Sequence, residues 1–146
     1  MANSTSYSDT SKAQDIARIL LGAILVVAGI GHLTFARTEF QVQVPDWVPL
    51  NKDLTVVLSG YVEILLGLAI LFVKRYRAQI GLFAGLFFIM VFPGNIAQYL
   101  NHRDGFGLDT DLLRFIRLLF QPVLVAWAWW SSGGWQFLKQ RSNSIQ

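Results

Sequence analysis

The chain of 146 residues contains no cysteine, and charged residues make up only 14% of it. The absence of cysteine excludes disulfides, thiolate metal sites, iron–sulfur clusters and dithiol chemistry. The scarcity of charge, beside 53% hydrophobic residues, excludes an ordinary water-soluble domain. The sequence also lacks a P-loop, a dinucleotide fingerprint, a zinc motif and a nucleophile elbow. It has two histidines, of which only His32 lies in an apolar run, so neither a metal nor a haem is expected.

Long apolar runs are what the sequence has in abundance. Each is close to the twenty residues that cross roughly 30 Å of hydrocarbon, and they cover residues 16–35, 54–73, 78–100 and 112–130. We therefore predict an all-α integral membrane protein, a four-transmembrane-helix bundle over residues 15–131. Residues 1–14 are rich in Ser, Thr and Asn without an apolar period, which predicts a disordered tail, and residues 132–146 form a second tail.

Basic residues at the ends of these runs predict the orientation. One side holds seven of them, Lys12, Arg18, Lys74, Arg75, Arg77, Lys139 and Arg141. The other side holds three, Arg37, Lys52 and Arg103. The positive-inside rule then places both tails in the cytoplasm. Because the basic residues cluster at helix ends, the net charge of +3 does not indicate a nucleic-acid partner, and the lipid bilayer is the expected one.

The connection between the first two runs, residues 37–53, is apolar for a solvated linker. It carries Val44, Trp47 and Val48 around Pro45 and Pro49. Three interpretations stay open: a segment that lies on the outer membrane surface, a lid that folds back over the bundle, or an ordinary outer loop with a Trp at the membrane interface.

Glycines at helical spacing predict close helix contacts. Gly60 and Gly67 lie two turns apart on the second run, and Gly81 and Gly85 form a small-xxx-small pair on the third. Helices in lipid associate where small residues let their backbones approach, so we interpret these glycines as packing positions.

Polar side chains inside the apolar runs need an explanation, because an ionisable group at the centre of a membrane helix costs roughly 2.5–3.5 kcal/mol on insertion scales. Given the predicted orientation, all of them lie in the outer half of the bundle. The candidate polar site comprises His32, Glu63, Asn95, Gln98, Arg114, Arg117 and Gln121.

The simplest consequence is an ion pair between Glu63 and Arg117 or Arg114, with His32 at its rim. Two interpretations compete. The residues form a satisfied hydrogen-bond network that fixes the register of the helices. Alternatively, they line an outward-facing pocket for a small polar or quinone-like ligand, in which arginine binds the anion and Glu63 or His32 carries a proton.

Short motifs in a fixed order resemble the DoxX-like family of small bacterial four-helix membrane proteins. The resemblance covers most of residues 17–130. The matching motifs are Gly29-Ile30-Gly31-His32, Val44-Pro45-Asp46-Trp47-Val48-Pro49, Ser59-Gly60-Tyr61-Val62-Glu63-Ile64-Leu65-Leu66-Gly67, Val91-Phe92-Pro93-Gly94-Asn95-Ile96 and Arg117-Leu118-Leu119-Phe120-Gln121. The chain departs from the family's usual pattern at Phe35-Ala36-Arg37 and at Gly94. The resemblance implies a multi-pass protein of the bacterial cytoplasmic (inner) membrane and a place in a membrane redox system.

Three functions follow as expectations. The first is an accessory or structural subunit of a membrane redox system, which works beside a membrane or peripheral partner protein. The alternative is a quinone- or small-acid-handling oxidoreductase component, with quinone as its cofactor. The second alternative is a small transporter, which would need a homo-oligomer to enclose a path across the membrane. The sequence does not decide whether the chain is itself catalytic.

Overall fold

A computed structural model describes residues 10–145, and over this range it is all-helical, without a strand. Its six helices are α1 (Lys12–Leu33), α2 (Arg37–Gln41), α3 (Lys52–Phe72), α4 (Arg77–Leu100), α5 (Asp111–Ser132) and α6 (Gly134–Asn143). Four of them, α1, α3, α4 and α5, are long and apolar enough to cross a membrane. The prediction of an all-α chain with four such helices is confirmed, and α4 and α5 continue through Pro93 and Pro122.

Polar caps decide where three of the long helices begin. The Ser11 side chain accepts from the Gln14 backbone N–H while the Gln14 side chain accepts from Ser11, so α1 starts at Lys12, earlier than the apolar run. The side chains of Asn51 and Thr110 each accept from one backbone N–H at the start of α3 and α5, whereas α4 begins without a side-chain cap. Residues 12–14 of the predicted N-terminal tail are therefore helical, and its residues 1–9 lie outside the described range. The predicted C-terminal tail contains α6.

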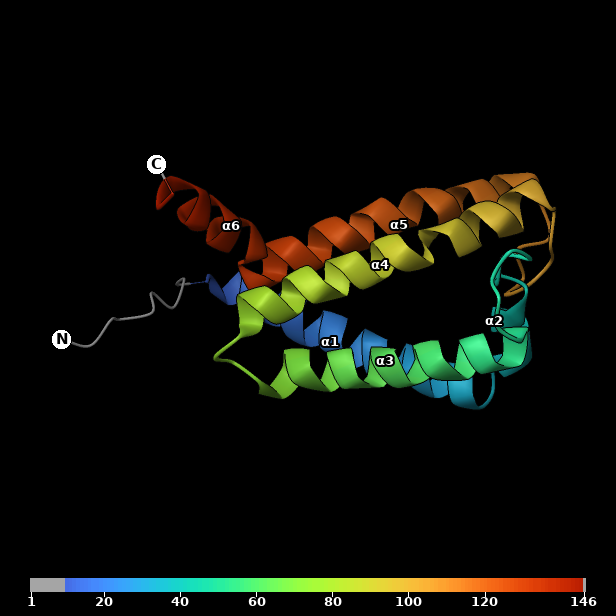
Figure 1. Cartoon of the computed structure of the whole chain (residues 1–146), viewed down its shortest axis with the longest axis horizontal. Helices are drawn as coiled ribbons and strands as arrows, with labels where there is room; N and C mark the ends of the chain where they lie inside the picture. The colour runs from blue at the N-terminus through green and yellow to red at the C-terminus, as the bar shows by residue number, and fades with distance from the viewer. Residues whose placement is uncertain (1–9, 146) are drawn as a thin grey trace.

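The bundle consists of two helix pairs, α1 with α3 and α4 with α5 (Figure 1). Glycines make the first pair close: a Cβ atom on Gly29 would lie 2.6 Å from the Gly60 carbonyl oxygen, and one on Gly67 would lie 2.7 Å from that of Gly22. In the second pair, Gly81 and Gly85 leave room for Ser132 and Trp129. The interpretation of these glycines as packing positions is confirmed.

The core between the pairs is small and apolar. It contains Leu21 and Leu25 of α1 with Phe87 and Phe88 of α4, and a further cluster member, Ala128, comes from α5. Most large apolar side chains of the long helices instead point outward: Leu65 is 67% exposed and Met90 is 76% exposed. A soluble protein rarely exposes apolar side chains continuously along four helices.

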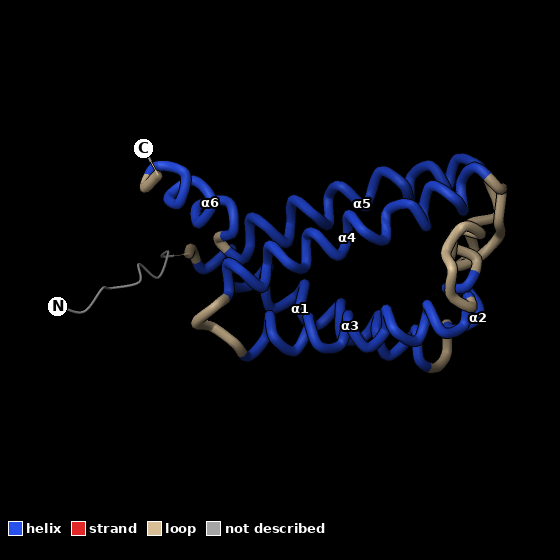
Figure 2. The backbone as a smooth tube through the Cα atoms, viewed as in Figure 1, coloured by secondary structure: helices blue, strands red, loops and turns tan. Residues whose placement is uncertain are grey.

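The connections lie at the two ends of the bundle (Figure 2). One end holds both termini of the described chain and the short turn between α3 and α4. The other holds α2 and the loops that lead to α3 and α5. We call these the terminal end and the loop end. The segment 37–53 lies across the loop end, where Gln43 bonds to Gln98 and Arg103 bonds to Val42 and Val44, while Trp47 stays 73% exposed.

Candidate functional site

His32 lies in the last turn of α1 and is buried, with 7% of its surface exposed. Its Nδ1 atom is 3.2 Å from the Val56 carbonyl oxygen and 2.8 Å from the Ser59 hydroxyl oxygen. The Ser59 hydroxyl donates to the Val56 carbonyl oxygen at 2.9 Å. Since a carbonyl only accepts and the serine proton is already used, Nδ1 carries the imidazole proton in this arrangement. The lone pair of a neutral His32 is therefore on Nε2.

Glu63 of α3 faces that lone pair. Its Oε2 atom is 3.4 Å from His32 Nε2, and both side chains are buried. Within the described part of the chain, Oε2 has no hydrogen-bond partner. With one proton shared between Oε2 and Nε2, the pair exists either as carboxylic acid and neutral imidazole or as carboxylate and imidazolium. Both forms are neutral overall, which is why the pair tolerates burial where a single charge would not.

The predicted ion pair of Glu63 with an arginine is wrong, since none of the described ion pairs joins Glu63 to an arginine. Arg114 pairs with Asp104 and with Asp111, the latter at 2.8 Å. Because Arg114 lies in the first turn of α5, its partners are Asp111 of the same turn and Asp104 of the preceding loop. Arg117, one turn further, attracts Glu63 through space and donates to Gln121 at 3.3 Å.

Asn95, Gln121 and Arg117 form a separate amide cluster between α4 and α5. The Gln121 Oε1 atom accepts from Asn95 at 3.0 Å as well as from Arg117, and its Nε2 donates to the Phe88 carbonyl oxygen at 2.7 Å. Gln121 is 2% exposed. Because the Gln121 amide is bonded through both its oxygen and its nitrogen, this cluster is a satisfied network that holds two helices in register.

Gln98 belongs to the closure of the loop end. It accepts from Gln43 at 3.1 Å and donates to the Arg103 carbonyl oxygen. We call residues 42–48 the lid. Arg103 holds the lid by donating to the carbonyl oxygens of Val42 and Val44, at 3.2 and 3.0 Å, and by an ion pair with Asp46 at 2.7 Å.

A cavity of about 150 Å³ lies beneath the lid, between α3 and α4. Of the seven predicted site residues, His32 alone lines it, beside Ser59 and Thr55. The Phe40 ring lies 3.5 Å from the His32 ring, centre to centre, and forms another part of the wall. The seven residues thus divide into groups: the His32–Glu63 pair, the amide cluster, and Gln98 and Arg114 in the loop-end closure.

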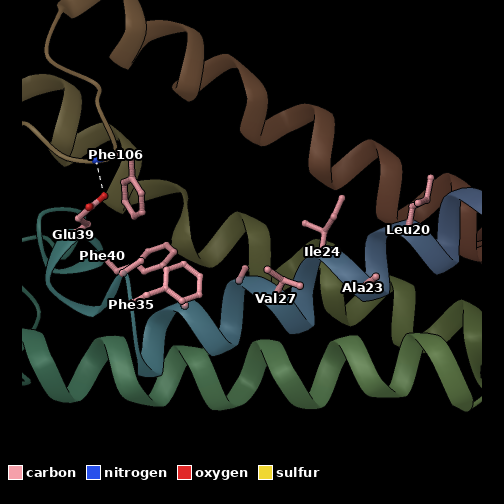
Figure 3. Close-up of a pocket in the computed structure, with 11 residues that line it drawn as sticks. Leu20, Ala23, Ile24, Val27, Phe35, Glu39, Phe40 and Phe106 are labelled. Atoms are coloured by element: carbon pink, nitrogen blue, oxygen red, sulfur yellow. Dashed lines mark hydrogen bonds between the residues drawn. The ribbon is translucent and has the colours of Figure 1, made fainter.

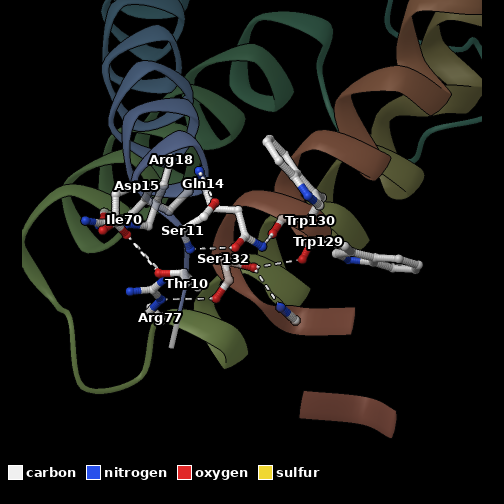
Figure 4. Close-up of polar contacts among 11 residues, drawn as sticks. Thr10, Ser11, Gln14, Asp15, Arg18, Ile70, Arg77, Trp129, Trp130 and Ser132 are labelled. Carbon is white, nitrogen blue, oxygen red and sulfur yellow. Dashed lines mark hydrogen bonds and ion pairs between the residues drawn. The ribbon is translucent and has the colours of Figure 1, made fainter. Parts of the chain in front are cut away.

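Two features were not predicted from the sequence. Ser59 fixes the His32 tautomer, and it had been noted only as the first residue of a motif, one turn before Glu63 on the same face of α3. A second polar cluster lies at the terminal end (Figure 4), where Arg18 donates to the Ile70 carbonyl oxygen and Arg77 donates to that of Ser132 at 3.3 Å. Both arginines are buried, whereas the sequence analysis counted them only as orientation signals.

Comparison with family models gives one match, over residues 21–132, to a family described as "Domain of unknown function (DUF8561)". The chain belongs to this family. The match begins within α1 and ends with α5, so the matched part of this chain includes the His32–Glu63 pair, the amide cluster and the lid. Comparison with curated proteins and with solved structures finds no match for the chain.

Proposed function

We propose that this DUF8561 chain is a multi-pass protein of the bacterial inner membrane, with its terminal end in the cytoplasm. Four helices of 22, 21, 24 and 22 residues each reach across the hydrocarbon, and their outward faces are apolar. The terminal end holds seven basic residues, and the loop end holds four once Arg114 in the first turn of α5 is counted. The bacterial assignment follows the resemblance to the DoxX-like family.

Single-cysteine labelling tests this orientation without any background, because the chain has no native cysteine. Asn101→Cys at the loop end and Ser142→Cys in α6 both replace exposed residues. In intact cells a membrane-impermeant thiol reagent is expected to label Asn101→Cys and to spare Ser142→Cys until the cells are lysed. Labelling of both, or of Ser142→Cys alone, contradicts the orientation.

We further propose that the His32–Glu63 pair is a proton-exchanging site for a small polar or quinone-like ligand, in a subunit that works beside a redox partner. The observation that carries this is the contact of Glu63 with the free Nε2 of a His32 ring that lines a cavity. In the amide cluster, both the oxygen and the nitrogen of the Gln121 amide are hydrogen-bonded, as expected of a structural network. The His32–Glu63 pair differs from this cluster because Glu63 Oε2 has no hydrogen bond within the described chain.

The geometry permits a proton relay through the imidazole ring. Protonated Glu63 donates its proton to Nε2, while the Nδ1 proton leaves toward Ser59 and an acceptor in the cavity. One proton passes from Glu63 to the acceptor, and Glu63 is left as a carboxylate. Arg117 attracts that carboxylate through space, which favours the state after release. A cavity of about 150 Å³ suits a small molecule or a single ring, as an engineered cavity of similar size binds benzene.

A ligand-dependent thermal shift tests the site. Duroquinone and small carboxylates are screened against the wild type, Glu63→Gln and His32→Gln, with Asp109→Asn as the charge-matched control, since Asp109 is an exposed loop residue. A ligand is expected to stabilise the wild type and Asp109→Asn, and to lose this effect in the two site variants. If no ligand stabilises the wild type more than Glu63→Gln, the proposal fails.

A further inference from the structure

A second hollow, separate from the lid cavity, follows the outward side of α1. It has a volume of about 550 Å³ and is lined by small residues, Ala23, Ala28 and Gly31, with Leu20, Ile24 and Val27 beside them. We call it the α1 groove. Figure 3 shows its lining side chains along one flank of α1, with Phe35, Phe40 and Phe106 gathered at the loop end. The groove is thus closed by aromatic rings at one end.

The dimensions of the α1 groove favour a single hydrocarbon chain over a protein helix. From Leu20 to Gly31 the helical rise gives a length of about 16 Å. The volume then corresponds to a mean cross-section of roughly 33 Å², a narrow space that runs along the helix. The aromatic rings at the loop end stop a partner helix from continuing along α1. An acyl-type chain fits both the width and the blind end.

The closed end contains the one ionisable side chain in the lining, that of Glu39. Its Oε2 atom accepts from the Phe106 backbone N–H at 3.0 Å, which holds the carboxylate at the mouth of the aromatic end (Figure 3). A carboxylate repels a fatty-acid or phosphate head group and accepts a hydrogen bond from a hydroxyl. The carboxylate of Glu39 therefore favours an uncharged hydroxyl head group over an anionic one.

We propose that the α1 groove binds the hydrocarbon chain of an uncharged lipid alcohol, whose hydroxyl group donates to Glu39. The alcohol would lie with its head at the outer interface and its tail toward the middle of the bilayer. Phe40 lines both this groove and the lid cavity, so its ring separates the two. The inference rests on the proposed membrane orientation but not on the chemistry of His32 and Glu63.

Photo-crosslinking in phosphatidylcholine vesicles tests this site. The probe is a diazirine-bearing dodecanol, and the labelled residues are found by mass spectrometry with and without excess dodecanol. We expect competed labelling within residues 20–31 and at Phe106. Ala23→Phe fills the groove and abolishes the competed labelling, while Ala126→Phe, at an exposed alanine of α5, retains it. Thermal melting of both variants verifies folding.

Glu39→Gln tests the preference for the head group, because it removes the charge of the side chain and keeps its shape. Dodecanoate is expected to compete at least about fivefold more weakly than dodecanol in the wild type, and this preference shrinks in Glu39→Gln. Labelling that excess dodecanol does not reduce, equal competition by dodecanoate, or crosslinks between the α1 helices of two copies would each overturn the proposal. Labelling retained in His32→Gln supports the separation from the lid cavity, and labelling lost in it contradicts that separation.

Discussion

The two ends of the bundle both bury ionisable groups, but they do so in different ways. At the terminal end, Arg18 and Arg77 donate to carbonyl oxygens in the last turns of α3 and α5, which have no partner within their own helices. At the loop end, His32 and Glu63 face each other as side chains. An arginine keeps its proton at every accessible pH, whereas an imidazole beside a carboxyl group exchanges one. Burial of charge alone thus does not mark a functional site.

Buried polar atoms without a hydrogen bond do not distinguish the two ends either, because both ends have them. Arg18 Nε and Ser131 Oγ at the terminal end are buried without a hydrogen bond in the described chain, as is Glu63 Oε2 at the loop end. What distinguishes the loop end is the cavity against His32. The loop end alone therefore combines, within the described chain, an exchangeable proton with an adjoining cavity.

The largest expected effect is at the terminal end. Arg18→Met keeps an unbranched side chain of comparable length but removes the bond to the Ile70 carbonyl oxygen. Because hydrogen bonds to charged groups contribute about 1.5–3 kcal/mol, we expect the free energy of unfolding to fall by about 2 kcal/mol. Reversible unfolding in mixed micelles measures it. A stability unchanged from the wild type would show that this end is not held by its buried arginine.

A smaller effect on stability is expected at the loop end. In Glu63→Gln an amide N–H replaces the carboxyl group and can donate to His32 Nε2, while no ionisable group stays buried on α3. We expect the free energy of unfolding to change by less than about 1 kcal/mol, in either direction. The same unfolding experiment checks this. A loss above about 2 kcal/mol would make the carboxyl group structural and remove the contrast between the ends.

The smallest effect concerns the lid. Hydrogen bonds from Lys52 and Arg103 hold the pKa of Asp46 below its ordinary value of 3.8. A lowered carboxyl pKa stabilises the closed lid above pH 3.8, and this contribution is lost as the pH falls through the lowered pKa. We expect lid amides to exchange hydrogen about threefold faster below that point in the wild type, and equally fast at every pH in Asp46→Asn.

Hydrogen exchange of residues 42–48, corrected for the intrinsic pH dependence, measures this. Asp109→Asn serves as the control, since it removes an exposed loop carboxylate outside the lid. Lid exchange that is the same in Asp46→Asn and in the wild type at neutral pH would show that Asp46 does not hold the lid.

The fold could be predicted from sequence because it depends on run length and small residues. Twenty apolar residues specify a long helix wherever they occur, and glycines two turns apart specify a close contact. The partners within the candidate site could not be predicted, because they depend on how each helix is rotated and on loop positions. Glu63 was assigned to arginine by charge, but the α1–α3 glycines bring His32 against it, and Asp104 and Asp111 occupy Arg114.

The glycine contacts between α1 and α3 have a mechanical consequence. With backbone against backbone at Gly29 and Gly60, the two helices cannot slide or part without breaking main-chain packing, so the spacing between His32 and Glu63 is built into a rigid hairpin-like unit. Fewer residues of α1 and α3 contact α4 and α5 than contact each other. Any breathing of the molecule is therefore expected along the seam between these two pairs, where it admits or releases small molecules while the acid–imidazole spacing stays constant.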